Sequence, residues 1–142
     1  VTVTAGNVAT PTYTYALPLT PQELWRQELF GSPSNTGSGA DSADPDGDGF
    51  TNVAEFTAGT HPLRSFDHFK TENPLRSGNV FSVGTSGKAG RTYVLERSVN
   101  LASGTWTTIA TQGPLTYDTA LTLHDAASPP GAAFYRIRVT GP

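Results

Sequence analysis

The sequence predicts a mainly β protein: a small antiparallel β-sandwich preceded by a short helical segment. The first supporting observation is composition, because 15 glycines and 11 prolines among 142 residues favour turns and short strands over long helices. The second is the pattern after residue 78, where alternating apolar and polar runs are separated by turn-forming residues without an intervening helical period. Strands that follow one another in this way form antiparallel sandwiches or barrels. Five strands are expected, at residues 79–85, 91–98, 105–111, 120–126 and 133–140.

The same pattern divides the chain into three parts. Residues 1–19 are the first part. Within it, residues 1–17 alternate β-branched or aromatic residues with small polar ones, which indicates one or two strands around a Gly-Asn turn. These strands could belong to this fold, to a preceding domain, or to a pairing with a partner. Residues 20–76 hold the helical segment. Residues 77–142 form the sandwich, for which we expect an arrangement like that of immunoglobulin or fibronectin type III domains.

The strongest helix signal is the stretch TPQELWRQELF at residues 20–30. Thr20 is a suitable N-cap, and Glu23 completes a capping box three residues later. Gly31 supplies the stop signal. Trp25 is expected to pack this helix onto the following loop region or onto the sandwich, which would contribute roughly 2–3 kcal/mol.

The rest of the N-terminal half is predicted from its composition and from the glycines and prolines that end helices and strands. Residues 31–43 are small, polar and rich in Gly and Ser, so they should follow the surface. A short helix is expected over residues 51–58, ended by Gly59. Residues 60–78 contain two prolines and read as an irregular connector.

Residues 44–55, DPDGDGFTNVAE, match the calcium-loop pattern D-x-[DN]-x-[DN]-G-x₅-E at every defined position. Alternate residues of such a turn point their oxygens inward, and Gly49 permits the sharp reversal. A plain solvated turn would need no Asn and Glu at the later positions of the pattern. Six residues would supply oxygen ligands: Asp44, Asp46, Asp48, Phe50 (through its carbonyl), Asn52 and Glu55.

This ligand set predicts Ca²⁺, because it offers six or seven oxygens and neither sulfur nor imidazole. Mg²⁺ prefers a smaller octahedron and gains less from a bidentate Glu55. Residues 31–43 separate the first helix from this EF-hand-like loop, and the chain holds a single such loop. Cooperative opening needs paired hands, so we expect a structural site and not a switch.

Charge and hydropathy exclude two kinds of partner. The formal net charge is −3, yet residues 44–55 carry four carboxylates and no basic residue, so the acidity is local. The nine Lys and Arg residues are scattered, which argues against nucleic acid. No apolar run approaches the roughly 18 residues of a membrane span. The absence of cysteine is compatible with a secreted domain that is stabilised by a metal.

Exposed aromatic residues suggest an alternative, a carbohydrate-binding face on the sandwich. In the run at 133–140, Tyr135, Ile137 and Val139 share the face expected in the core. The candidate ligand face consists of Trp106, Phe134, Arg136 and Arg138. Packing within the sandwich is the competing interpretation for Trp106, because aromatic residues commonly fill such cores.

Two catalytic or metal alternatives find less support. His61, Asp67 and His68 lie close in sequence, but their spacing fits no common zinc pattern. Ser, His and Asp residues occur without a nucleophile motif such as G-x-S-x-G. The chain is therefore not expected to be an enzyme.

Residues 25–63 resemble a region near the C-termini of large secreted proteins of Verrucomicrobia-like bacteria. There W-R-x-x-x-F-G precedes D-P-D-G-D-G-x-x-N-x-x-E and then G-T-D-P, and the loop is similar to thrombospondin type 3 and dockerin calcium loops. The later stretches RTYVLERSVNLASGTWTTIA and AFYRIRV resemble the small β-domain that ends those proteins. The resemblance implies a Ca²⁺-stabilised, non-catalytic extracellular module, with ligands at the loop positions given above. His61 stands where that family usually has Asp.

The expected function is therefore that of a structural or anchoring module of a larger secreted or cell-surface protein. Bound Ca²⁺ would rigidify the segment that joins it to the sandwich, and its partners would be the parent polypeptide or neighbouring domains. One alternative is polysaccharide binding through the aromatic face. Another is self-association through strands in residues 1–16.

Overall fold

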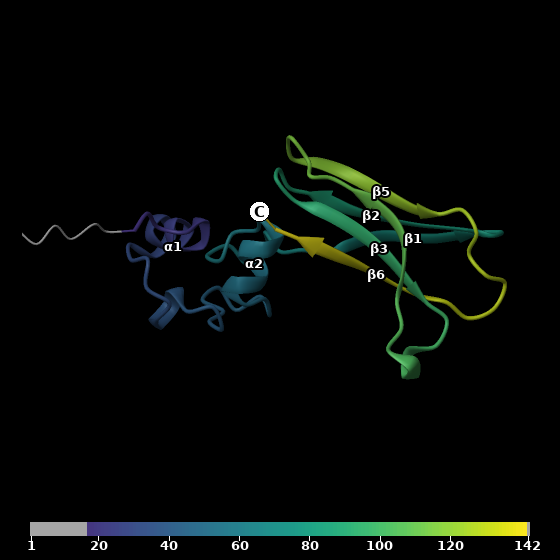
Figure 1. Ribbon diagram of the computed structural model, residues 1–142, viewed down its shortest axis with the longest axis horizontal. Helices are drawn as coiled ribbons and strands as arrows, with labels where there is room; N and C mark the ends of the chain where they lie inside the picture. The colour runs from purple at the N-terminus through teal and green to yellow at the C-terminus, as the bar shows by residue number, and fades with distance from the viewer. Residues whose placement is uncertain (1–16, 142) are drawn as a thin grey trace, which may run out of the picture.

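The computed structural model describes residues 17–141 and places a helical part beside a six-stranded β part. Figure 1 shows the helix α1 at one end, α2 next to the strands, and the two sheets at the other end. The helical elements are α1 (Pro21–Phe30), η1 (Gly37–Gly39), α2 (Asn52–Ala58) and η2 (Leu101–Ser103). None of the helices within residues 17–141 has the length and apolar character that crossing a membrane requires. Residues 1–16, where N-terminal strands were expected, lie outside the described residues.

The first helix forms as its end signals predicted. The Thr20 side chain accepts a hydrogen bond from the Glu23 backbone N–H, and the Glu23 carboxylate accepts one from the Thr20 N–H, at 2.8 Å. This reciprocal pair satisfies donors that the first turn would otherwise leave free. At the other end Gly31 takes a left-handed conformation with φ 76°, which glycine adopts without steric cost.

Trp25 packs the first helix against α2, directly after the loop, and not against the sandwich. Its ring packs against Phe56 of α2 in a T-shaped arrangement, with centroids 5.6 Å apart, and also contacts Phe30 at 5.9 Å. The second helix was predicted to within one residue, and Gly59 ends it with φ 79°. The helical segment therefore has a small cluster of half-buried aromatic rings of its own.

The β part consists of two facing antiparallel sheets, which confirms a small sandwich. One sheet has the strand order β1-β2-β5 and the other β4-β3-β6. All pairings are antiparallel. The strands are β1 (Thr71–Ser77), β2 (Val80–Gly87), β3 (Thr92–Ser98), β4 (Thr107–Gln112), β5 (Thr119–Asp125) and β6 (Phe134–Thr140).

The sequence analysis missed β1, which lies in the stretch predicted as an irregular connector. Asn73 has φ 48°, and the register with β2 shifts between Glu72 and Leu75. Together with Pro74, this bulge interrupts the alternation that identifies a strand. The sheet therefore begins at Thr71, so the expected boundary between residues 76 and 77 cuts through a strand.

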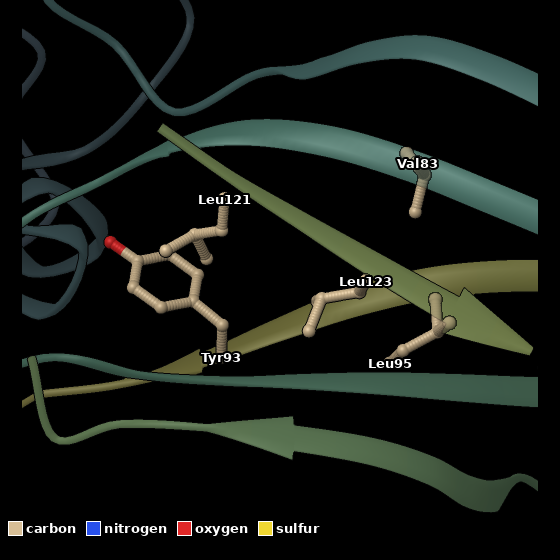
Figure 2. Close-up of a cluster of buried hydrophobic side chains, with 5 residues drawn as sticks. All are labelled: Val83, Tyr93, Leu95, Leu121 and Leu123. Carbon is tan, nitrogen blue, oxygen red and sulfur yellow. The ribbon is translucent and has the colours of Figure 1, made fainter. Parts of the chain in front are cut away.

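The core lies between the sheets. Figure 2 shows side chains of β2, β3 and β5 directed toward one another. Tyr93 and Leu95 of β3 are 0% exposed, and the Tyr93 hydroxyl accepts a hydrogen bond from the Lys88 N–H at 2.8 Å. The β6 residues expected to face inward pack against this cluster, as predicted. The buried cluster consists of Val83, Tyr93, Leu95, Leu121 and Leu123.

Candidate metal centre

Three of the predicted ligands converge in the loop that precedes α2. Asp44, Asp46 and Asp48 each offer a carboxylate oxygen within 4.8 Å of the others. Backbone N–H groups hold this shape: Gly47 and Gly49 donate to the two Asp44 oxygens at 2.9 and 3.0 Å. Gly47 and Gly49 have φ 73° and 94°, values that favour glycine. The pattern thus predicted a turn that gathers carboxylates.

One oxygen of each later aspartate is used by the backbone and the other is left free. Asp46 Oδ1 accepts from the Asp48 N–H at 3.3 Å, and Asp48 Oδ1 accepts from the Phe50 N–H at 2.8 Å. The second oxygens, Asp46 Oδ2 and Asp48 Oδ2, are buried without a hydrogen-bond partner. His68 Nδ1 lies 3.5 Å from Asp48 Oδ2 but is only 2.8 Å from the Ser65 carbonyl, which can only accept. The histidine therefore leaves the carboxylate oxygen unsatisfied.

The later ligand positions show the same deficit. Asn52 and Glu55 are 0% and 1% exposed, yet Asn52 Oδ1 and Glu55 Oε2 have no hydrogen-bond partner. Within residues 17–141, five buried side-chain polar atoms lack a partner, and four of them are oxygens of predicted ligands. The fifth is Arg26 Nε. An unsatisfied buried polar group costs about 1–3 kcal/mol, so this concentration of free oxygens calls for a positive partner.

The electrostatics of the loop also favour a bound cation. Burial, followed by the negative charges of Asp46, Asp48 and Asp44, raises the pKa of Glu55 to about 7. A hydrogen bond from the Thr60 hydroxyl to Glu55 Oε1, at 3.3 Å, opposes this shift. Glu55 lies outside the group of three aspartates but experiences their field. A cation among these carboxylates would replace repulsion by attraction.

Asn52 is oriented by the segment expected to be a surface linker. Its amide nitrogen donates to the carbonyls of Ser38 and Ala40, both at 2.7 Å. Because both amide hydrogens are used there, Oδ1 must point the other way. The Asn52 backbone N–H also donates to the Ala43 carbonyl at 2.8 Å. Most of the segment is exposed, but its carbonyls have a positioning role that composition did not reveal.

Asp41 is a second positioning residue that the sequence analysis missed. Its carboxylate accepts from Gln22 Nε2 at 2.9 Å, from Asn35 Nδ2 at 3.1 Å and from the Arg26 guanidinium. Its carbonyl accepts from the Val53 N–H at 3.1 Å. Asp41 thus ties α1 to the loop and to the first turn of α2. Arg26 sits in the buried face of α1, where the sequence offered only a charged residue within a helix.

The opposite end of α2 is fixed to the sandwich by Arg91. Its guanidinium donates to the carbonyls of Thr57 at 3.0 Å and Phe56 at 2.7 Å. Cations stabilise helix C-termini, where carbonyls lack partners. Lys88, on the same β2–β3 turn, pairs with Asp67 at 3.0 Å. The short helix that carries Asn52 and Glu55 is therefore held between the loop and the β part.

The ring of Phe50 and the residues weighed for zinc have other partners. Phe50 stacks on His68 with centroids 5.8 Å apart and an interplanar angle of 9°. His61 Nδ1 accepts a hydrogen bond from the Leu63 N–H at 3.2 Å, and Asp67 pairs with Lys88. Through Phe50, the loop contacts the segment that leads into β1.

The residues predicted as a ligand face lie on the outer surface of the second sheet. The Arg136 guanidinium carbon lies 4.2 Å from the centroid of the Trp106 ring. Arg136 and Arg138 both donate to Glu96, at 2.7 and 3.3 Å, and Glu96 was not among the predicted residues. Phe134 is 41% exposed. Trp106, Arg136 and Arg138 thus have partners within the protein, and sugar binding stays a prediction.

Glu96 provides a test of this surface. The pKa of Glu96 is lowered, mainly by the hydrogen bond from Arg136 and further by the one from Arg138, while burial opposes the shift. The pKa of Glu96 is therefore lower in the folded protein than its ordinary value of 4.5 in the unfolded chain. The ion pairs stabilise the fold fully above pH 4.5, and this stabilisation is lost as the pH falls through the pKa of the folded state. Since the arginines are half exposed, we expect Glu96→Gln to cost only about 1 kcal/mol at pH 7. Urea unfolding at pH 7 and pH 3 measures it, and an equal cost at both values would contradict the ion-pair account.

The resemblance to the C-terminal region of large secreted bacterial proteins rests on the motifs quoted for it. The structure shows a turn that brings Asp44, Asp46 and Asp48 together within those motifs. It does not test the relationship, which therefore stays a prediction. Comparison of the chain with family models, with curated proteins and with solved structures finds no match.

Proposed function

We propose that residues 44–55 bind one Ca²⁺. The observation that carries the proposal is the set of four buried, unpartnered oxygens, which belong to Asp46, Asp48, Asn52 and Glu55. With Asp44 and the carbonyl of Phe50, these groups offer the six or more oxygens that Ca²⁺ requires. The donor set contains only oxygen, which favours Ca²⁺ over the softer transition metals.

The proposed role of the ion is structural. Ca²⁺ would draw together the loop and the first turn of α2, and Arg91 would transmit this order to the sandwich through the carbonyls of Phe56 and Thr57. The protein would then act as a non-catalytic module that spaces or anchors a larger polypeptide. We propose an immunoglobulin-like or fibronectin type III-like sandwich for it, supported by the two facing antiparallel sheets.

We also propose that the module works outside the cell or at its surface. Calcium sites of extracellular modules have dissociation constants of about 10⁻⁴–10⁻³ M, which extracellular Ca²⁺ can fill. At a tenfold excess over the dissociation constant, binding would stabilise the fold by about 1.4 kcal/mol. A site of this kind can hold a small domain rigid without disulfides, and the chain has no cysteine.

Isothermal titration calorimetry tests the ion directly. We expect one Ca²⁺ per chain, with a dissociation constant below about 10⁻³ M. Mg²⁺ should bind more weakly, because it demands a compact octahedron and keeps part of its water shell. A titration of the EDTA-treated protein that shows no heat of binding at several temperatures, and no change in melting temperature with Ca²⁺, would refute the proposal.

A further inference from the structure

Within residues 17–141 the sandwich has four edge strands, and the outer edge of β6 has no strand partner there. At one side of the sandwich the edge strands β4 and β5 contact each other. At the other side β1 is interrupted by Pro74 and the bulge beside it. Across Phe134–Thr140 there is no Pro, Gly or bulge, and within the described chain this strand pairs only with β3. Edges that lack these interruptions are sites of strand addition.

Two apolar hollows follow this edge. One, of about 330 Å³, lies between α2 and the end of β6 and includes Phe69, Ile137 and Val139 in its wall. The other, of about 110 Å³, lies between β1 and β6 and reaches Leu95 of the core, with Ile137 again in its wall. Figure 1 shows that β6 ends beside α2, so the first hollow lies at the C-terminal end of the strand. An added strand would place alternate side chains over both hollows.

We propose that the free edge of β6 accepts a short strand from within residues 1–16 of a second copy of this chain. This segment alternates in two places: Val1 and Val3 with threonines, and Tyr13 and Tyr15 with threonines. In an added strand, either of these two stretches would present apolar or aromatic side chains on one face and hydroxyls on the other. The segment contains no charged side chain, so it would bring no charge of its own into the hollows.

The position of the first described residues favours a second copy over the same chain. Leu17 leads into α1, and Figure 1 places α1 beyond α2 from the sandwich. In a strand from the same chain, part of residues 1–16 would be needed to run past α1 and the loop at residues 44–55 before reaching β6. Donation between copies needs no such detour and joins them head to tail, a heterologous arrangement.

Cross-linking between two single-cysteine proteins tests the source of the strand. The full-length chain has no cysteine, so Thr14→Cys and Thr140→Cys each introduce a single thiol. We mix the Thr14→Cys protein with ¹⁵N-labelled Thr140→Cys protein and treat them with a short bis-maleimide. The matched control pairs Thr14→Cys with Thr122→Cys, which lies on the outer side of β5. A docked segment is held at roughly millimolar effective concentration, so we expect the mixed dimer to exceed the control by ~10-fold.

Light scattering and hydrogen exchange complete the test. The mass of the wild-type chain should rise with concentration, and amides of β6 should then exchange ~10-fold more slowly. The variant Val3→Pro/Tyr13→Pro should abolish both effects, since proline cannot continue a strand ladder. A single-chain mass at all concentrations would overturn the proposal. So would a Thr14→Cys/Thr140→Cys chain that cross-links only within itself, because the strand would then come from the same copy.

Discussion

Replacing Glu55 by glutamine should change the stability of the protein in opposite directions with and without calcium. In saturating Ca²⁺ the variant should melt at a lower temperature than the wild type, because the ion loses a charged, bidentate ligand. Losing one partner of a buried charge pair costs about 3 kcal/mol, so the calcium affinity should fall ~100-fold. Differential scanning calorimetry at pH 8 measures both conditions on the same proteins.

In EDTA the same substitution should raise the melting temperature. The pKa of Glu55 is raised to about 7, first by burial and then by the neighbouring aspartates. A raised carboxyl pKa means that the charged form is disfavoured in the fold, so at pH 8 the metal-free protein carries an unfavourable ionised group. Glutamine removes this charge and has nearly the same size, and its amide oxygen can still accept the hydrogen bond from the Thr60 hydroxyl. We expect a gain of the order of 1–3 kcal/mol.

The control for this experiment is Glu72→Gln, which removes the same charge from β1, where Glu72 pairs with the exposed Lys70 at 3.4 Å. It should alter neither the calcium affinity nor the difference between the two melting curves. If Glu55→Gln lowered stability equally in Ca²⁺ and in EDTA, Glu55 would be an ordinary structural residue. A metal ligand requires that the substitution lower the melting temperature in Ca²⁺ and raise it in EDTA.

Local chemistry explains why the two α-helices and five of the six strands could be predicted. The capping pair of Thr20 and Glu23, the stop at Gly59 and the alternation of β6 are each contained within a few residues. The loop was also predicted as a unit, since its spacing brings the carboxylates of one short turn together. The spacing predicts an ion in this loop, and the calorimetric titration with Ca²⁺ tests that prediction.

The features that sequence reasoning missed depend on distant pairs. Asp41 meets Arg26 from 15 residues away, and Arg91 meets Thr57 from 34 residues away. No local pattern distinguishes these charges from solvated ones. The first strand was missed for the opposite reason, because Asn73 and Pro74 gave it the local signals of a loop.

Arg91→Met should uncouple the loop from the sandwich while leaving the loop able to bind calcium. Methionine keeps much of the apolar stem but cannot donate to the carbonyls of Phe56 and Thr57. Hydrogen bonds from charged donors contribute about 1.5–3 kcal/mol each before the cost of burying the guanidinium is subtracted. We therefore expect a net loss of roughly 2 kcal/mol in the free energy of unfolding.

The two tryptophans report the uncoupling, because Trp25 lies in α1 and Trp106 lies beside β4. Variants with Trp106→Phe or Trp25→Phe isolate each signal in the full-length chain. In the wild-type background, Ca²⁺ should raise the midpoints of both signals together. With Arg91→Met it should still raise the Trp25 midpoint but shift the Trp106 midpoint much less. Arg64→Met, in the exposed connector, is the matched control, and equal calcium shifts of both signals in Arg91→Met would show that the coupling runs through other contacts.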